Sequence, residues 1–276
     1  MKVAFGTVVY KQNANFTAEY INSINSQNYF GFDTLLLNDD LPNEEYSNIV
    51  RSIKHNAIAL KGKAGATPTE LRAELIERSF NKGYDLLVLG DFDDTFSGNR
   101  VSEIVKNFDE KHGFFYNDLY HFDGGKKYFQ DIPGTTYSLS GILESNYLGL
   151  TNTAINLKLL NVDVIKELYT CNSVVFDWFM FLTLLLHGLK GKKVDNCKTF
   201  YRFHHSNIAG KQDDTTEEIK KEIQIKLDLY YNLKHMNPIF VEKYNYYNNI
   251  RESFDVCSAD KQNDYWWSKI NSNTER

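Results

Sequence analysis

Residues 86–96 read Leu-Leu-Val-Leu-Gly-Asp-Phe-Asp-Asp-Thr-Phe, an apolar run that stops abruptly at three carboxylates. The run has the length and composition of a buried β-strand, and Asp91, Asp93 and Asp94 follow at its end. Carboxylates this close together repel one another unless a cation is present. The stretch therefore predicts a divalent metal site, and a metal at the carboxyl end of a strand is typical of phosphate chemistry.

The residues before this stretch alternate between strand and helix patterns. The start of one helix is well defined, because Thr67, Pro68 and Glu70 form a capping box, and Gly83 can end that helix. Such alternation is typical of an α/β fold with a mostly parallel sheet, which binds ligands at the carboxyl ends of its strands. We expect strands at 3–10, 32–37, 57–60 and 86–89, and helices at 17–26, 46–53 and 67–83.

A second acidic pair, Asp39 and Asp40, falls where the second strand ends. The fold places it at the same edge of the sheet as Asp91, and two acidic sites at one edge are more informative than either alone. A carboxylate there can accept hydrogen bonds from a ribose hydroxyl or a base N–H. The alternative for the pair taken alone is an acidic turn before Pro42.

The second half of the chain begins with a hairpin signal and ends in a helical pattern. Asp123-Gly124-Gly125 separates two strand-like segments, 113–121 and 126–130. We expect helices at 156–167 and 176–187, a strand at 198–202, and a helical tail from Thr215 to Arg276 that carries Tyr265-Trp266-Trp267 near its end.

Asp177 interrupts the otherwise apolar run 174–186. Burying an unpaired carboxylate costs several kcal/mol, so the side chain must either face a cleft or be paired. In an apolar rim it would have a raised proton affinity and suit general-base chemistry. The alternative is a helix N-terminal carboxylate favoured by the helix dipole, and the residues alone leave both interpretations open.

A basic and imidazole cluster follows the strand expected at 198–202. Arg202 can bind a phosphate group, and His204 or His205 can bind a metal or a phosphate. Each histidine taken alone is more often an ordinary surface or core residue.

The composition of the 276 residues narrows the class of protein. A formal net charge of -5 argues against a general nucleic-acid binder. Cys171, Cys197 and Cys257 stand too far apart for a zinc motif or a disulfide framework, which fits a reducing compartment. The first residues do not resemble a signal peptide, and no apolar run reaches the ~20 residues of a membrane span. We therefore expect a cytoplasmic protein.

Together these features resemble a GT-A nucleotide-sugar glycosyltransferase of family 2, over about residues 1–211. The motif that begins at Tyr201 and ends at Gly210 is the longest and the most specific of those that match. The chain departs from the family at Leu41-Pro42, where Gly and Ser are usual, at Ala73 in place of Asn, and at Phe203 in place of Gln. The matching motifs are Val3–Tyr10, Ser23-Ile24 with Gln27-Asn28-Tyr29, Asp39-Asp40, Arg72, Asp91-Phe92-Asp93-Asp94, Asp177-Trp178 and Tyr201-Arg202-x-His204-x-x-Asn207-x-x-Gly210.

The resemblance implies a GT-A (Rossmann-like) α/β domain over 1–211, its mostly parallel sheet flanked by helices, with a helical C-terminal extension over 212–276 packed on it. It implies inverting transfer of a sugar from a nucleotide-diphosphate donor to a hydroxyl of a glycan or a lipid-linked saccharide, with Asp177 as general base and Trp178 on the acceptor side. The implied metal is Mn²⁺ or Mg²⁺, held by Asp93, Asp91, Asp94 and His204. The implied nucleotide and donor residues are Tyr10, Asp39, Asp40, Arg72, Asp91 and Arg202.

Two other functions remain open from the sequence. A haloacid-dehalogenase-like phosphatase would use Asp91 as nucleophile, Asp93 as acid and Thr95 in support, although about ninety residues precede a motif that normally opens its domain. A non-catalytic module that binds a nucleotide sugar would leave Asp177 unexplained. The tail past Thr215 can dock on a second copy of the chain, touch a membrane surface that bears a lipid-linked acceptor, or pack on the core, which is the commonest outcome.

Overall fold

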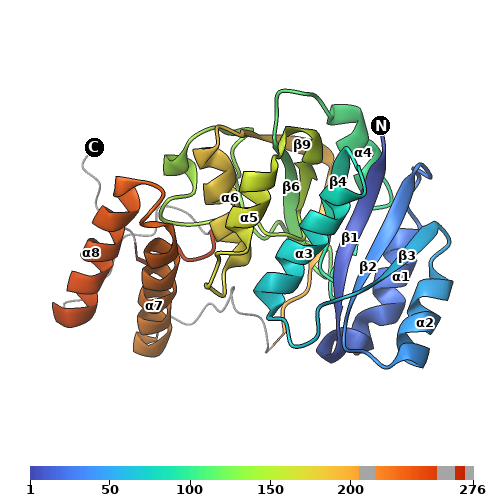
Figure 1. Ribbon diagram of the computed structural model, residues 1–276, viewed down its shortest axis with the longest axis horizontal. Helices are drawn as coiled ribbons and strands as arrows, with labels where there is room; N and C mark the ends of the chain where they lie inside the picture. Colours follow the sequence, from blue (N-terminus) through green and yellow to red (C-terminus); the bar gives the residue numbers. More distant parts are fainter. Residues whose placement is uncertain (205–214, 254–264, 271–276) are drawn as a thin grey trace.

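A computed structural model describes residues 1–204, 215–253 and 265–270 of the chain (Figure 1). His205, Asn207 and Gly210 of the last motif, the expected domain boundary at 211 and Cys257 lie outside these residues. None of the described helices combines the length and apolar character needed to cross a membrane.

One mixed sheet forms the centre of the molecule. In the described part of the chain its strands are β1 (Val3–Tyr10), β2 (Phe32–Asp39), β3 (Asn56–Lys61), β4 (Leu86–Leu89), β5 (Thr95–Phe96), β6 (Phe114–His121), β7 (Thr135–Thr136), β8 (Thr153–Asn156) and β9 (Gly191–Tyr201). The order across the sheet is β3-β2-β1-β4-β8-β6-β9-β5, with β7 beside β9. The strands from β3 to β4 are parallel, β8 is antiparallel to both of its neighbours, and β6 and β9 are again parallel.

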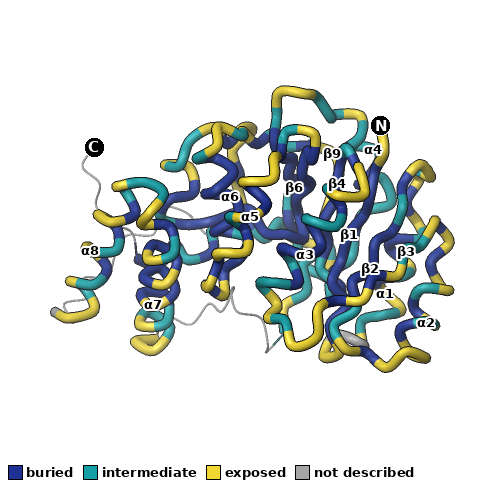
Figure 2. Tube along the Cα trace, viewed as in Figure 1, coloured by how far each residue is buried: buried dark blue, intermediate teal, exposed yellow. Residues whose placement is uncertain are grey.

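Helices cover both faces of this sheet, as the sequence predicts (Figure 1). The helices on its faces are α1 (Thr17–Asn25), α2 (Asn43–Ser52), α3 (Pro68–Asn81), α4 (Arg100–Asn107), α5 (Val162–Leu168) and α6 (Phe176–Leu186), and α7 (Thr216–Leu233) and α8 (Pro238–Ser253) follow in the C-terminal part of the chain. Along β1, Ala4 and Val8 join the apolar cluster of α3, α5 and α6, whereas Val3 and Phe5 join that of α1, α2 and α4. This alternation is expected of a strand buried on both faces, and Figure 2 shows the central strands and α6 as buried.

The expected start of α3 is confirmed in detail. The Thr67 hydroxyl accepts the backbone N–H of Glu70 at 3.2 Å, and the Glu70 carboxylate accepts the N–H of Thr67 at 2.8 Å. Gly83 follows the helix at φ 69°, a left-handed conformation that glycine adopts without steric cost. The helix therefore begins and ends where its capping residues dictate, and Arg72 is its fifth residue.

The helix expected at 156–167 begins too early. Residues 153–156 form β8, which pairs with Leu86 to Val88 of β4, and α5 begins only after Asn161. The Asn161 side chain accepts the N–H groups of Asp163 and Val164 at 3.0 Å, which defines the N-terminus of the helix. Of the residues expected to be helical, Asn156 ends strand β8, Leu157–Leu159 form a short 3-10 helix, and the α-helix itself begins only at Val162.

The tight turn at Gly124 is confirmed, with φ 75° at Gly124 and a bond from His121 N–H to the Lys126 carbonyl at 2.9 Å. Residues 126–130 do not form the second strand that was expected. They contribute a single isolated antiparallel bridge, between Lys127 and Tyr120 of β6. The strand expected at 198–202 is longer than predicted, since β9 begins at Gly191.

The tail is helical only in part. Helices α7 and α8 pack against each other through Tyr230, Phe240 and Tyr247, and lie at the end of the molecule farthest from β3 (Figure 1). The Tyr230 hydroxyl donates to the Leu143 carbonyl at 2.7 Å, so this pair also packs on the α/β core. Residues 265–270 are not helical, which corrects the prediction for that segment.

Candidate active site

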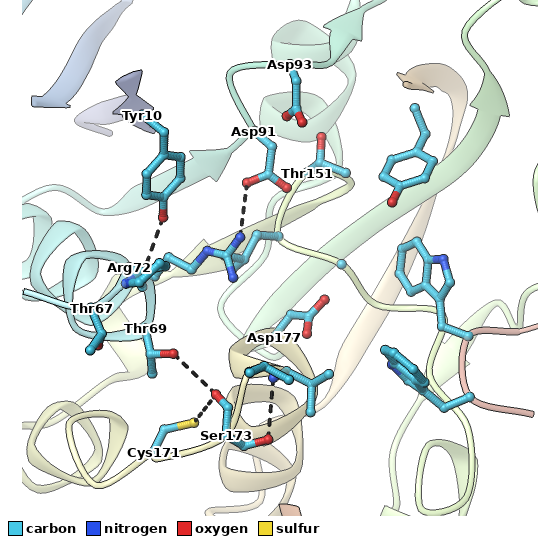
Figure 3. Close-up of a pocket in the computed structure, with 18 of the residues that line it drawn as sticks. Tyr10, Thr67, Thr69, Arg72, Asp91, Asp93, Thr151, Cys171, Ser173 and Asp177 are labelled. Atoms are coloured by element: carbon cyan, nitrogen blue, oxygen red, sulfur yellow. Dashed lines mark hydrogen bonds and ion pairs between the residues drawn. The ribbon is translucent and has the colours of Figure 1, made fainter. Parts of the chain in front are cut away.

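A cleft of about 500 Å³ opens at the carboxyl edge of the parallel strands. The end of β1, the loop after β4, the first turns of α3 and α6, the end of β9 and the segment 265–270 all contribute to its walls (Figure 3). Its volume falls in the range of small-molecule sites. The predicted site residues that line it are Tyr10, Arg72, Asp91, Asp93, Asp177 and His204.

Arg72 reaches from α3 into the middle of this cleft. Figure 3 shows its guanidinium among Tyr10, Asp91 and Asp177, with Nη2 4.0 Å from Asp91 Oδ1. Its buried Nε has no hydrogen-bond partner among the described residues. Burial lowers the pKa of Arg72, but Tyr10, Asp91 and Asp177 raise it by more, so the side chain stays cationic. A cation with an unused donor, set in a cleft, suits an anionic ligand.

The carboxylates after β4 differ in orientation. Asp91 and Asp93 line the cleft, whereas Asp94 is 1% exposed, accepts the Arg202 N–H at 2.7 Å through Oδ1, and has no partner for Oδ2 among the described residues. Burial raises the pKa of Asp91 to about 6; Arg72 opposes the shift, and Asp93 and Asp177 add to it. Burial, followed by repulsion from Asp93 and Asp91, raises the pKa of Asp94 well above its usual range. Their surroundings therefore disfavour the ionised forms of Asp91 and Asp94.

Arg100, which the sequence analysis did not single out, supplies part of the compensation from within the core. It is fully buried at the start of α4, where Nε donates to Asn117 Oδ1 at 3.0 Å and Nη2 donates to the Thr153 carbonyl at 3.2 Å. Burial lowers its pKa to about 10, and Asp94 is among the groups that oppose this shift. An arginine that opens a helix looks like a surface residue in the sequence, so no local pattern indicates this role.

The end of β9 is tied to the same carboxylates. His204 Nε2 lies 2.7 Å from Asp93 Oδ2. Arg202 donates from Nε to the Asp93 carbonyl at 2.9 Å and from Nη2 to Glu19 at 2.8 Å, and its guanidinium lies over the rings of Phe16 and Phe122. Arg202 does not line the cleft. Its contacts brace the Asp93–Asp94 loop, and its predicted role at the donor gains no support from its position.

The residues present can hold a divalent cation only if a bound ligand supplies part of its coordination shell. Within the described ranges, no three His, Cys, Asp or Glu side chains surround a common metal position. Mg²⁺ and similar cations, however, are often held by one or two carboxylates and complete their shell with phosphate oxygens and water. Asp91 and Asp93 provide that pair, and Oδ2 of the neighbouring Asp94 has no hydrogen-bond partner among the described residues. We therefore regard this donor set as fitting Mn²⁺ or Mg²⁺.

Asp177 is both a carboxylate that faces a cleft and a carboxylate at a helix N-terminus, which are the two interpretations that the sequence leaves open. It stands in the first turn of α6, where Oδ1 accepts the Trp178 N–H at 2.8 Å, and it lines the cleft. Burial raises its pKa and Arg72 lowers it. Trp178 does not line the cleft: its indole is fully buried and donates to the Ile142 carbonyl at 2.5 Å. Trp178 therefore holds the start of α6 in place, and its predicted acceptor-side role gains no support from its position.

Asp39 and Asp40 lie beside the cleft without lining it. Asp39 is the register partner of Tyr10 across β1 and β2, and it contributes to the raised pKa of Tyr10, about 12, which comes mainly from burial. Asp40 is exposed, with φ 56°. Their predicted role at the nucleoside stays a prediction.

The sequence analysis missed two parts of the cleft wall. Thr69 Oγ1 on α3 donates to the Ser173 carbonyl at 3.2 Å and so joins that helix to the loop 171–175. Trp266 and Trp267 line the cleft from the C-terminal segment. The paired tryptophans were visible in the sequence, but no local pattern placed them at this edge of the sheet.

No family model matches the sequence, and no curated protein matches it. Solved structures are similar in fold. S. aureus TarS 1–349 in complex with UDP-GlcNAc aligns with a TM-score of 0.62 at 12% identity, over 92% of this chain and 73% of that chain. The mannosyltransferase PcManGT from Pyrobaculum calidifontis, in complex with GDP-Man and Mn²⁺, gives 0.54 at 10% identity, over 93% and 76%.

The chain has a GT-A fold. A third GT-A structure, GalNAc-T7 with UDP, GalNAc and Mn²⁺, gives a TM-score of 0.53 at 9% identity over 85% of this chain and 48% of that chain. The TarS match covers more of the chain than residues 1–211 contain, so the similarity to TarS extends beyond residue 211. At these identities the comparison shows the fold, and the cleft residues must carry the argument for function.

Proposed function

We propose that this protein is a glycosyltransferase that moves a sugar from a nucleotide-diphosphate donor to an acceptor hydroxyl. One observation carries the proposal: Asp177, Arg72 and the pair Asp91 and Asp93 line a single cleft of a GT-A fold. A cation, two carboxylates for a metal and a separate carboxylate with a raised pKa are what displacement of a diphosphate by a hydroxyl requires.

The donor's diphosphate would lie between Arg72 and the Asp91–Asp93 pair. The Arg72 guanidinium, whose side chain is 23% exposed, can donate hydrogen bonds to a phosphate oxygen. Asp91 and Asp93 would hold Mn²⁺ or Mg²⁺, with His204 orienting Asp93. The bound metal would offset negative charge on the leaving diphosphate. The structures of PcManGT with GDP-Man and Mn²⁺ and of TarS with UDP-GlcNAc support a nucleotide-sugar donor and a divalent metal.

Asp177 would act as general base in an inverting transfer. The acceptor oxygen forms a bond to the anomeric carbon, the bond from that carbon to the phosphate oxygen breaks, and the nucleoside diphosphate leaves with the electron pair. The acceptor proton passes to the Asp177 carboxylate. The proposed acceptor is a glycan or a lipid-linked saccharide, and the cytoplasmic location stays a prediction.

The phosphatase alternative loses support from the fold. Its motif would require Asp91 as nucleophile with Thr95 in support, but Thr95 lies on β5, paired with Phe200 of β9. Asp91 itself follows β4 in the interior of a GT-A sheet. These placements favour a carboxylate that binds a metal over one that attacks a phosphate ester.

A turnover screen tests the proposal. UDP-, GDP-, dTDP- and ADP-sugars would each be incubated with the protein, Mn²⁺ and a mixture of simple saccharides, and released nucleoside diphosphate would be measured. We expect release with donors of one base, and none of the phosphate from p-nitrophenyl phosphate. Phosphate release from that ester without any nucleotide release would favour the phosphatase, and binding of a sugar nucleotide without release would favour a non-catalytic module.

A further inference from the structure

The C-terminal segment 265–270 is held at both ends by specific contacts. At one end, Trp266 and Asn146 exchange backbone hydrogen bonds of 3.0 Å in both directions. At the other, the Ile270 N–H donates to Glu222 Oε1 at 2.9 Å, and the Ile270 carbonyl accepts from the Tyr247 hydroxyl at 3.0 Å and from Lys226. The segment therefore has a defined path across the molecule from α7 back to the cleft.

Buried charge on α7 forms one of these anchors. Lys226 is 0% exposed and Glu222 is 3% exposed, and their charged atoms lie 3.2 Å apart. A buried ion pair is seldom a net source of stability, because desolvation of both charges offsets their attraction. A buried polar group can, however, fix one arrangement of the chain when all its partners are satisfied. Here both charges bind the backbone of Ile270, so the ion pair fixes the position of the segment.

The segment presents two indoles to the cleft. Trp266 packs against Phe129 and Tyr201, with ring centroids 4.9 and 5.9 Å apart, and its buried indole Nε1 has no hydrogen-bond partner among the described residues. Trp267 is partly exposed and adopts φ 63°. A left-handed backbone is unusual for a bulky side chain. Such a conformation persists where surrounding contacts impose it, and it often marks a functional site.

The lining of the cleft is chemically divided. The part formed by Tyr10, Arg72, Asp91 and Asp93 is ionic, which suits a diphosphate and its metal. The remaining lining includes the aromatic surface of Trp266 and Trp267 and polar residues such as Asn172 and Ser173. A pyranose ring matches this second part, because one face of the ring exposes C–H groups that pack on an indole while its hydroxyls bind polar groups around the edge.

We propose that the segment 265–270 completes a subsite for the acceptor, with a pyranose ring stacked on Trp267. This inference rests on the proposed function, since it assigns the acceptor to a saccharide. It gives the C-terminal extension a role in binding: α7 and α8 position the wall of the cleft that receives the acceptor.

Indole resonances test the subsite directly. The chain has three tryptophans, so ¹⁵N-tryptophan labelling gives three indole N–H signals, which tryptophan-to-phenylalanine substitutions assign. The probes are methyl glucoside, methyl galactoside, N-acetylglucosamine and lactose at millimolar concentrations. We expect at least one saccharide to shift the Trp267 signal saturably and to leave Trp178 unchanged, because Trp178 is fully buried outside the cleft. The absence of a saturable shift at Trp267 with every saccharide would overturn the proposal. An equal shift caused by glycerol, a polyol without a ring, or by dodecane-loaded micelles, an apolar surface, would overturn it as well.

Variants connect this binding to turnover. Trp267→Ala should raise the KM for the saccharide that shifts the resonance by about tenfold or more and should weaken the binding of that saccharide to a similar extent. Trp267→Tyr should restore part of the affinity. The matched control is Tyr231→Ala, which removes an exposed aromatic ring from α7 outside the cleft and should change neither quantity.

The two proposals fail in different ways. If nucleotide sugars neither bind nor turn over while a saccharide still shifts Trp267, the glycosyltransferase function is wrong and the saccharide site stands. If donor turnover is normal and Trp267→Ala leaves the acceptor KM unchanged, the subsite is wrong and the function stands.

Discussion

Single residues decide the chemistry of the cleft, and Asp177 is the clearest case. Its carboxylate lines the cleft from the first turn of α6, burial raises its pKa, and Arg72 opposes that shift. The N-terminus of the helix favours the ionised form. The net effect is a raised pKa, which increases the proton affinity of Asp177 and suits a general base.

Asp177→Asn should separate chemistry from binding. The amide keeps the shape of the side chain and cannot take the acceptor proton, so we expect transfer to fall by roughly 10²–10⁴-fold. Nucleotide affinity should change little, because the ionic part of the cleft is intact. Steady-state transfer rates and nucleotide calorimetry on the same preparation check both statements. Transfer at the wild-type rate would remove Asp177 from the mechanism.

Arg72 sets the pH range of that base. Its cation lowers the pKa of Asp177, so replacing it by a neutral residue should raise that pKa. A base must be deprotonated to act, and activity is lost as the pH falls through its pKa. We therefore expect the acid limb of the kcat/KM profile to move to higher pH in Arg72→Gln, along with weaker donor binding. An acid limb at the wild-type pH would show that Arg72 does not act on the base.

At the level of elements, the end of β4 places the metal-binding loop. A Cβ on Gly90 would lie 2.5 Å from the Phe96 ring and 2.7 Å from the Phe5 ring. Gly90→Ala should therefore displace these rings or the strand, cost about 1–3 kcal/mol of unfolding free energy, and weaken nucleotide binding through Asp91. Gly134→Ala is the matched control, because a Cβ there meets no atom within 4 Å. Equal denaturation midpoints for the two variants would contradict this account of β4.

Elements with local signals were predictable from the sequence. The apolar runs of β1 and β4 and the capping box of α3 contain enough information within a few residues. Strand β8 was missed because its identity comes from pairing with β4, a partner far away in the sequence. The motif-based residues Arg72, Asp91, Asp93 and Asp177 meet in one cleft, whereas Asp94, Arg202 and Trp178 serve as supports around it.

The position of the tryptophan pair could not be predicted for the same physical reason. Trp266 reaches the cleft because Asn146 binds it and because Glu222, Lys226 and Tyr247 hold Ile270. Each of these partners is distant in sequence. A doublet of aromatic residues near a chain end carries no information about which surface it will cover.

For the molecule as a whole, the cleft concentrates negative charge in a chain that is already acidic. A carboxyl whose pKa is higher in the folded state than in the unfolded state destabilises the fold as the pH rises between the two values. Burial raises the pKa of Asp91 to about 6, against an unfolded value of about 3.9. The metal-free protein therefore loses stability at this site between about pH 4 and pH 6.

The wild type and Asp91→Asn should consequently diverge with pH. Without metal, the variant should gain stability relative to the wild type as the pH rises from about 4 to 7, by an amount on the order of 1 kcal/mol. Mn²⁺ at pH 7 should stabilise the wild type more than the variant. Chemical denaturation at several pH values, with and without EDTA, measures the difference, and a gap that is constant with pH would contradict the raised pKa.

The central claim is that Asp91 and Asp93 bind a nucleoside diphosphate through a divalent metal. Calorimetric titration of the diphosphate identified by the turnover screen, with Mn²⁺ and with EDTA, tests it in the wild type and in Asp93→Asn. We predict that removing the metal weakens wild-type binding by about tenfold or more, and that Asp93→Asn binds weakly in both conditions. Equal affinity with Mn²⁺ and with EDTA, or wild-type metal-linked affinity in Asp93→Asn, would contradict the account.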